Sequence, residues 1–155
     1  ECVRENRPLP FDIGGQVIYY VGPSPTPPGR ICGSAGPTTS GRMDPYTPLL
    51  LGLGLKGMIG KGRRSPEVIE SMIKNRAVYF GAVGGAAVLI SDCITRLEAV
   101  AWPELGAEAV FRLRVEDLPT VVLIDAFGND LYRDGPARYR GGGPPPVEEE
   151  PAGGL

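Results

Sequence analysis

Histidine is absent from the 155-residue sequence, and cysteine and tryptophan are scarce, with three copies and one. Without histidine, the chain lacks the side chain that most often serves as a general base or metal ligand near neutral pH. Any acid–base chemistry must therefore come from other residue types or from another chain. Cys2, Cys32 and Cys93 show no C-x-x-C metal spacing. This favours their use as small buried hydrophobes, and the alternative is that they meet in space as cluster ligands.

Neither sign of charge is in large excess, because 16 Lys and Arg stand against 18 Asp and Glu. A net charge of −2 argues against a protein held on nucleic acid or a membrane surface by bulk charge. No apolar run approaches the roughly 20 residues that span a bilayer. An odd cysteine count without a signal peptide favours a reducing compartment, so we expect a cytoplasmic protein.

Glycine and proline are abundant instead, with 23 and 17 copies, about a quarter of the chain. They gather at 22–29, 33–37, 52–62 and 141–154. This clustering indicates an ordered chain punctuated by turns and not a uniformly low-complexity one. The last part has little to bury. We therefore predict one domain over residues 1–134 and a flexible tail over residues 135–155.

Short β-branched runs that alternate with periodic apolar segments predict an α/β fold with a mixed sheet. Ser65, Pro66 and Glu67 are typical of a helix start. Residues 1–13 indicate the end of a polar helix and a linker, so we expect a further segment upstream. We expect strands at 17–21, 58–59, 77–80, 97–102, 108–115, 121–124 and 131–132, and helices at 65–76 and 86–94. The segment 43–55 is expected to form a short helix or two turns that end at Gly52 or Gly54.

The stretch from Cys32 to Asp44 reads C-G-S-A-G-P-T-T-S-G-R-M-D. Gly33 and Gly36 can adopt backbone angles closed to other residues, and hydroxyl side chains accept hydrogen bonds at helix starts. A glycine-rich turn that opens a helix directs several N–H groups one way, with the helix dipole behind them. Arg42 adds a forked donor suited to a carboxylate or phosphate. The stretch predicts an anion-binding site, and the alternative is a simple helix cap after a tight turn.

A second candidate, Lys61, stands between Gly60 and Gly62 just after a short apolar run. No side chain on either neighbour blocks close approach to this lysine. The segment resembles a fragment of a phosphate-binding loop but lacks the G-x-x-x-x-G-K-[ST] spacing. The alternative is a basic turn that faces solvent.

Several motifs occur together in one order: G-Q-V-I-Y-Y-V-G-P-S-P-T-P-P-G, G-S-A-G-P-T-T-S-G-R-M-D, M-I-G-K-G and A-V-Y-F-G-A-V-G-G-A-A. In these motifs the chain closely resembles the β subunit of class I, iron–sulfur-dependent fumarases and L-tartrate dehydratases. The same unit forms the C-terminal domain of the single-chain enzymes. The resemblance covers roughly residues 8–132, and it implies a swivelling β/β/α domain.

The resemblance implies reversible addition of water to a C4 dicarboxylate, fumarate to L-malate, with L-tartrate dehydration as the alternative. It implies a 4Fe–4S cluster held by three cysteines of a partner α subunit, and an assembly of two α and two β subunits. Thr38 corresponds to the proposed base that takes the C3 proton of malate. Arg42 corresponds to a residue that binds the substrate carboxylate, and Lys61 to one that lies on the substrate. Thr39 is the alternative base and a further substrate contact.

A threonine hydroxyl is a poor base in water, so this role requires Lys61, Arg42 and helix N–H groups to stabilise an alkoxide. Two cations also balance the charge of a dicarboxylate, so a closed site need not bury unpaired charge. The family carries an Arg-Asp-x-x-His motif upstream of the V-I-Y-Y run, and neither Arg4 nor Arg7 stands in that context. A hypothesis from another class is a non-catalytic module that binds an anion or assembles a complex.

Overall fold

The computed structural model describes residues 2–3, 5 and 7–140, and its central element is a four-stranded sheet. The sheet order is β1-β2-β3-β6, with β1, β2 and β3 parallel and β6 antiparallel to β3. These strands are β1 (Val17–Tyr19), β2 (Gly57–Gly60), β3 (Val78–Gly81) and β6 (Val121–Ile124). The predicted α/β class with a mixed sheet is confirmed.

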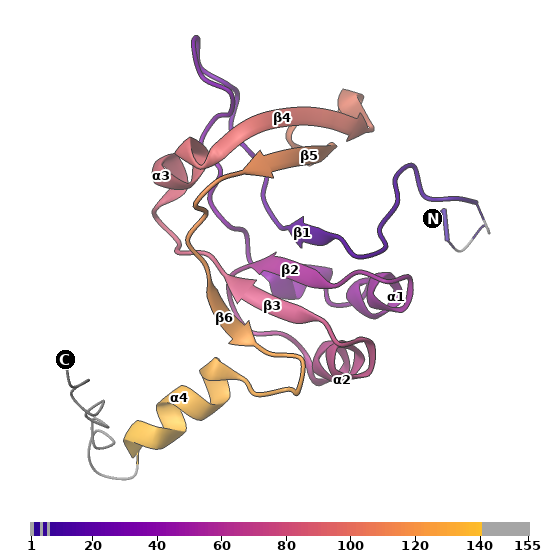
Figure 1. The fold of residues 1–155 in the computed structure, drawn as a ribbon, viewed down its shortest axis with the longest axis vertical. Helices are drawn as coiled ribbons and strands as arrows, with labels where there is room; N and C mark the ends of the chain where they lie inside the picture. Colours follow the sequence, from indigo (N-terminus) through magenta and orange to yellow (C-terminus); the bar gives the residue numbers. More distant parts are fainter. Residues whose placement is uncertain (1, 4, 6, 141–155) are drawn as a thin grey trace, which may run out of the picture.

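A second, antiparallel pair of strands lies against the main sheet (Figure 1). It joins β4 (Ile94–Ala101) to β5 (Val110–Val115) through a 3₁₀ helix (Pro103–Glu108). The helices α1 and α2 pack together on the other side of the main sheet. The helices are α1 (Thr47–Gly52), α2 (Pro66–Asn75), α3 (Ala87–Asp92) and α4 (Leu131–Arg140).

Strand alternation divides the core into two clusters, because successive side chains point to opposite faces of a sheet. In and after β1, Ile18 and Tyr20 contact the cluster under α1 and α2, while Tyr19 contacts the cluster under α3 and β4. The first cluster is built from Ile13, Tyr20, Leu51, Leu55, Met58, Val68, Met72, Ala77, Tyr79, Leu123 and Ile124. The second is built from Cys32, Ala35, Ala82, Ile90 and Ile94.

Helix α2 begins and ends where the sequence predicts. The Ser65 hydroxyl accepts the backbone N–H of Val68 at 3.4 Å, and Pro66 occupies the first helical position. The helix ends at Asn75 because Arg76 adopts left-handed angles, with φ of 52°. Among the residues described, no helix is both long and apolar enough to cross a membrane.

The predicted strand at 131–132 is wrong, because α4 begins at Leu131. A carboxylate oxygen of Asp130 accepts the Tyr132 backbone N–H at 2.9 Å, so Asp130 caps this helix. Helix α4 continues to Arg140, through the start of the predicted tail, and residues 141–155 lie outside the described residues. The predicted helix at 86–94 is shorter, since Ile94 already begins β4. The described residues before position 13 form turns and irregular backbone and no helix.

Candidate active site

The candidate site lies at the carboxyl ends of the three parallel strands, the edge where open α/β sheets bind ligands. The chain leaves β1 toward this edge and then forms the long proline-rich loop. After the loop, Thr38 lies at the same edge again. The backbone N–H of Thr38 donates to the Tyr20 carbonyl at 2.9 Å, and its hydroxyl donates to the same oxygen at 3.1 Å. Thr38 is therefore fixed beside the end of β1 and is half-buried.

Thr39 and Lys61 are paired across a short parallel bridge that prolongs the sheet beyond β2. The backbone N–H of Ser40 donates to the Lys61 carbonyl at 3.0 Å and completes this junction. The Lys61 side chain extends toward the loop after β3, because a Cβ placed on Gly84 would lie 3.8 Å from its Nζ. The structure thus brings Thr38, Thr39 and Lys61 to one edge of the sheet.

Arg42 follows this junction in the 3₁₀ helix Ser40–Met43 and is exposed. Lys61 is exposed as well. Neither side chain forms an ion pair or hydrogen bond with another of the residues described. Two cations that no carboxylate of the described residues neutralises therefore lie on neighbouring segments, which suits an anionic ligand with more than one negative group.

The helix start predicted at Thr38 to Arg42 is confirmed only in part, since a short helix does begin at Ser40 with Thr39 as its N-cap residue. The segment forms only a four-residue 3₁₀ helix, and the Thr39 side chain makes no capping hydrogen bond. The physical reason is that the N–H groups of Thr38 and Ser40 are taken by carbonyls of neighbouring strand ends. The N–H groups of Thr38 and Ser40 are thus occupied and not free to bind an anion.

Close packing beneath the site explains the glycine before Lys61. A Cβ on Gly60 would lie 1.9 Å from the Ser40 hydroxyl, so only glycine lets the two segments meet. The buried Tyr79 hydroxyl is hydrogen-bonded to the Ser40 hydroxyl and to the Gly62 carbonyl, each at 3.0 Å. Burial raises the pKa of Tyr79 above its ordinary value, so this phenol stays a neutral donor at physiological pH.

The sequence interpretation missed Arg64 and Asp44, which form a buried ion pair directly behind these segments. The only signal for it was the pair of arginines after G-K-G and the aspartate that closes the first stretch. From a pattern alone, Arg63 and Arg64 are indistinguishable, yet Arg63 is exposed and Arg64 is buried.

The cysteines do not form a metal site within this chain. Among the described residues, no three His, Cys, Asp or Glu side chains come together as a possible metal site. Cys32 is buried, and its thiol has a pKa raised chiefly by burial. The Cys93 thiol is directed to the carbonyls of Leu89 and Asp117. The part of the chain that the structure describes therefore offers no set of ligands that fits a 4Fe–4S cluster.

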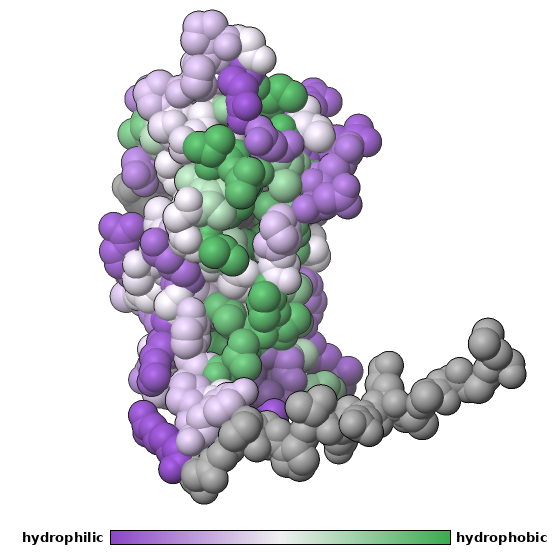
Figure 2. Space-filling model, turned by 90° about the vertical axis from the view of Figure 1, so that its left-hand side faces the viewer, coloured by the Kyte–Doolittle hydropathy of each residue, from purple (hydrophilic) through white to green (hydrophobic). Residues whose placement is uncertain are grey.

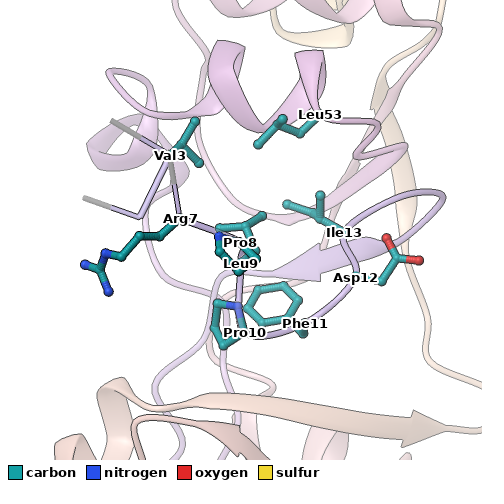
Figure 3. Close-up of a pocket in the computed structure, with 9 residues that line it drawn as sticks. All are labelled: Val3, Arg7, Pro8, Leu9, Pro10, Phe11, Asp12, Ile13 and Leu53. Atoms are coloured by element: carbon teal, nitrogen blue, oxygen red, sulfur yellow. The ribbon is translucent and has the colours of Figure 1, made fainter. Parts of the chain in front are cut away.

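A hollow of about 560 Å³ lies elsewhere, near the beginning of the described chain (Figure 3). Its lining is mainly proline and apolar side chains, and Figure 3 shows the Arg7 guanidinium pointing away from them. Arg7 is also ion-paired with Glu5. None of the candidate site residues lines this hollow, and its chemistry does not suit a dicarboxylate.

Together, these observations define an α/β domain that carries two exposed cations, Arg42 and Lys61, on adjoining segments at the carboxyl ends of its parallel strands. The family described as Fumarase C-terminus matches residues 1–135, so the chain belongs to that family. This confirms the resemblance seen in the sequence motifs.

The chain is 45% identical over 135 residues to "Fumarate hydratase class I, anaerobic" of Escherichia coli, covering 86% of this chain and 25% of that protein. It is 42% identical to "Fumarate hydratase 2" of Leishmania major, covering 85% of this chain and 24% of the relative. A Methanocaldococcus jannaschii protein named for the β subunit of L(+)-tartrate dehydratase is 34% identical, with 86% of this chain and 72% of that protein covered. The chain thus spans about a quarter of the length of the two fumarate hydratases.

Proposed function

We propose that this chain is the β subunit of an iron–sulfur hydro-lyase that reversibly adds water to a C4 dicarboxylate, fumarate to L-malate. The observation that carries the proposal is the junction of Thr38 and Thr39 with Lys61 at the carboxyl edge of the sheet. Arg42 lies two residues beyond the Ser40–Lys61 hydrogen bond. Family membership supports the same chemistry.

In this proposal the two cations bind the two ends of the substrate. Arg42 presents a planar fork that matches one carboxylate, and Lys61 supplies a point charge for the negative charge that develops during proton removal. Neither cation must first break an ion pair with the residues described. Binding therefore costs no rearrangement of such a pair.

Thr38 is the proposed base for the C3 proton of malate, with Thr39 as the alternative. The Thr38 hydroxyl donates its proton to the Tyr20 carbonyl, and a carbonyl oxygen repels an alkoxide. Proton abstraction by Thr38 thus requires its Oγ1 to turn from Tyr20 toward the positive charge of Lys61. Thr39 is exposed and pairs directly with the lysine backbone, which keeps it as the second candidate.

We propose that the 4Fe–4S cluster belongs to a partner α subunit, which is implied by the relative named as a β subunit. When bound, such a cluster would supply a Lewis-acidic iron, while the residues of this chain would bind, orient and deprotonate the substrate. Figure 2 views the side of the molecule toward which β1, β2 and β3 point in Figure 1, and apolar side chains gather along it. Exposed apolar side chains of the described residues include Leu89 of α3 and Val121 and Val122 of β6. An apolar surface beside charged groups suits coverage by a partner.

The proposed assembly contains two α and two β subunits, and the proposed family fold is the swivelling β/β/α domain. Reconstitution with the cluster-bearing subunit under anaerobic conditions tests the function. Turnover of L-malate to fumarate is the expected result, and light scattering of the complex measures the stoichiometry. Selective turnover of L-tartrate would instead support tartrate dehydratase, the activity in the name of the M. jannaschii relative. Equal dicarboxylate binding by the chain alone, with no turnover of the complex, would support a non-catalytic module.

A further inference from the structure

Arg64 is a buried cation directly behind the candidate site. Its side chain is 0% exposed. Its guanidinium donates to an Asp44 carboxylate oxygen at 2.7 Å, to the Thr47 hydroxyl at 2.8 Å and to the Met58 sulfur at 3.2 Å. The guanidinium carbon lies 5.4 Å from the ring centre of Tyr20 and 5.1 Å from that of Tyr79. Both rings are therefore placed for cation–π contact with the same charge.

Asp44 connects this cation to the loop that carries Lys61. One carboxylate oxygen accepts from Arg64, and the other accepts the backbone N–H of Ser65 at 2.7 Å. The Asp44 side chain is 13% exposed, so the pair is shielded from screening by salt. Lys61 lies three residues before Arg64 and is exposed to solvent. Arg42 lies two residues before Asp44 and is exposed as well. Each partner of the buried pair is thus close in the chain to one exposed cation.

Stability alone does not account for such a pair. Burying two charges costs several kcal/mol per ion, and well-packed apolar side chains of similar volume are often as stable or more so. An ion pair with two fixed donors instead specifies one relative position of two segments. Here the segments are 40–47 and 60–65, which the Tyr79 hydroxyl also joins through Ser40 and Gly62.

We propose that Arg64 and Asp44 are positioning residues that fix the spacing between Arg42 and Lys61, and so select anions with two carboxylates. The proposal rests on the proposed function. A ligand held at both ends depends on this spacing, because a small misplacement of one group weakens simultaneous contact. A ligand with a single carboxylate requires only one of the cations and is insensitive to the spacing.

The test compares two inhibitors of the assembled, cluster-bearing enzyme, succinate with two carboxylates and butyrate with one. In Arg64→Lys the charge remains but the fork is lost, and in Asp44→Asn the charge of the partner is lost. Each is expected to raise the succinate inhibition constant about tenfold, the equivalent of about 1.4 kcal/mol. The butyrate constant should change less than about twofold. Asp92→Asn, which removes the exposed pair with Arg30, is the matched control and should change neither constant.

A merely structural role predicts less folded enzyme, with both inhibition constants as in the parent. That result, or an equal loss of affinity for both inhibitors, would overturn the proposal. Tyr79→Phe is a milder variant that removes the hydroxyl joining Ser40 to Gly62 and leaves the ring beside Arg64. It should accelerate hydrogen exchange in the 57–66 segment, with only a small fall in melting temperature. Unchanged exchange in all three variants would equally refute a positioning role.

Failure of the proposed function has a different signature. In the same assay, Arg42→Lys and Lys61→Met should both weaken the binding of succinate. If neither does, the site itself is misassigned, whatever Arg64 does. If both substitutions raise the succinate inhibition constant, while Arg64→Lys and Asp44→Asn leave it as in the parent enzyme, only the positioning role is refuted.

Discussion

Replacement of Thr38 by alanine separates chemistry from folding in this site. The side chain makes one hydrogen bond, from its hydroxyl to the Tyr20 carbonyl at 3.1 Å. That carbonyl also accepts the Thr38 backbone N–H at 2.9 Å, so the substitution leaves no buried acceptor without a partner. The expected loss of stability is therefore about 1 kcal/mol, the ordinary net value of a hydrogen bond.

A loss of that size leaves nearly all of the enzyme folded, because domains are stable by about 5–15 kcal/mol. A positioned base, in contrast, contributes about 10²–10⁴-fold to the rate. Thr38→Ala is thus expected to lower kcat by at least about 100-fold with little change in KM, which marks a lost step and not lost binding. Thr38→Ser retains an oxygen near the same place and should keep far more activity than alanine.

The assay is steady-state kinetics on the assembled enzyme, with iron content and melting temperature matched between variants. Thr39→Ala is the paired control, and if Thr38 is the base it should affect substrate affinity more than turnover. An inactive Thr39→Ala beside an active Thr38→Ala would reverse the assignment. Near-full kcat in both would show that neither threonine is the base, and the proton would then go to Lys61 or to a residue of the partner.

Three further predictions address binding, ionisation and the cluster. Arg42→Lys should raise KM for the dicarboxylate about tenfold or more, the equivalent of about 1.5–3 kcal/mol for hydrogen bonds to a charged group; an unchanged KM would make Arg42 a surface residue. Burial, with a smaller effect of Cys32, raises the pKa of Tyr19 to about 12. The preference of the folded state for the neutral Tyr19 phenol stabilises the protein fully below pH 10, and this stabilisation is lost between about pH 10 and 12. Tyr19→Phe should therefore reduce the fall in the free energy of unfolding across that range, and an unchanged pH profile would contradict this. Chain purified alone without oxygen should hold no stoichiometric iron, and cluster absorbance in that sample would refute a partner-held cluster.

The sequence by itself determined the α/β class, most strand positions and helix α2. These features depend on local patterns, such as the cap at Ser65 and the β-branched and aromatic run at 17–21, and they do not require knowledge of distant contacts. The motifs around Thr38 and Lys61 also identified the family from sequence alone, since their order is independent of folding.

Only the tertiary structure decided how those motifs meet. The helix expected at Thr38 to Arg42 is reduced to the short 3₁₀ helix at Ser40–Met43, and strand ends far away in the chain take the backbone donors of Thr38 and Ser40. The same contacts bring Thr39 beside Lys61, 22 positions away. No local pattern distinguishes exposed Arg63 from buried Arg64. Burial is set by Asp44 and two tyrosine rings that reach Arg64 only when the sheet and its loops have packed together.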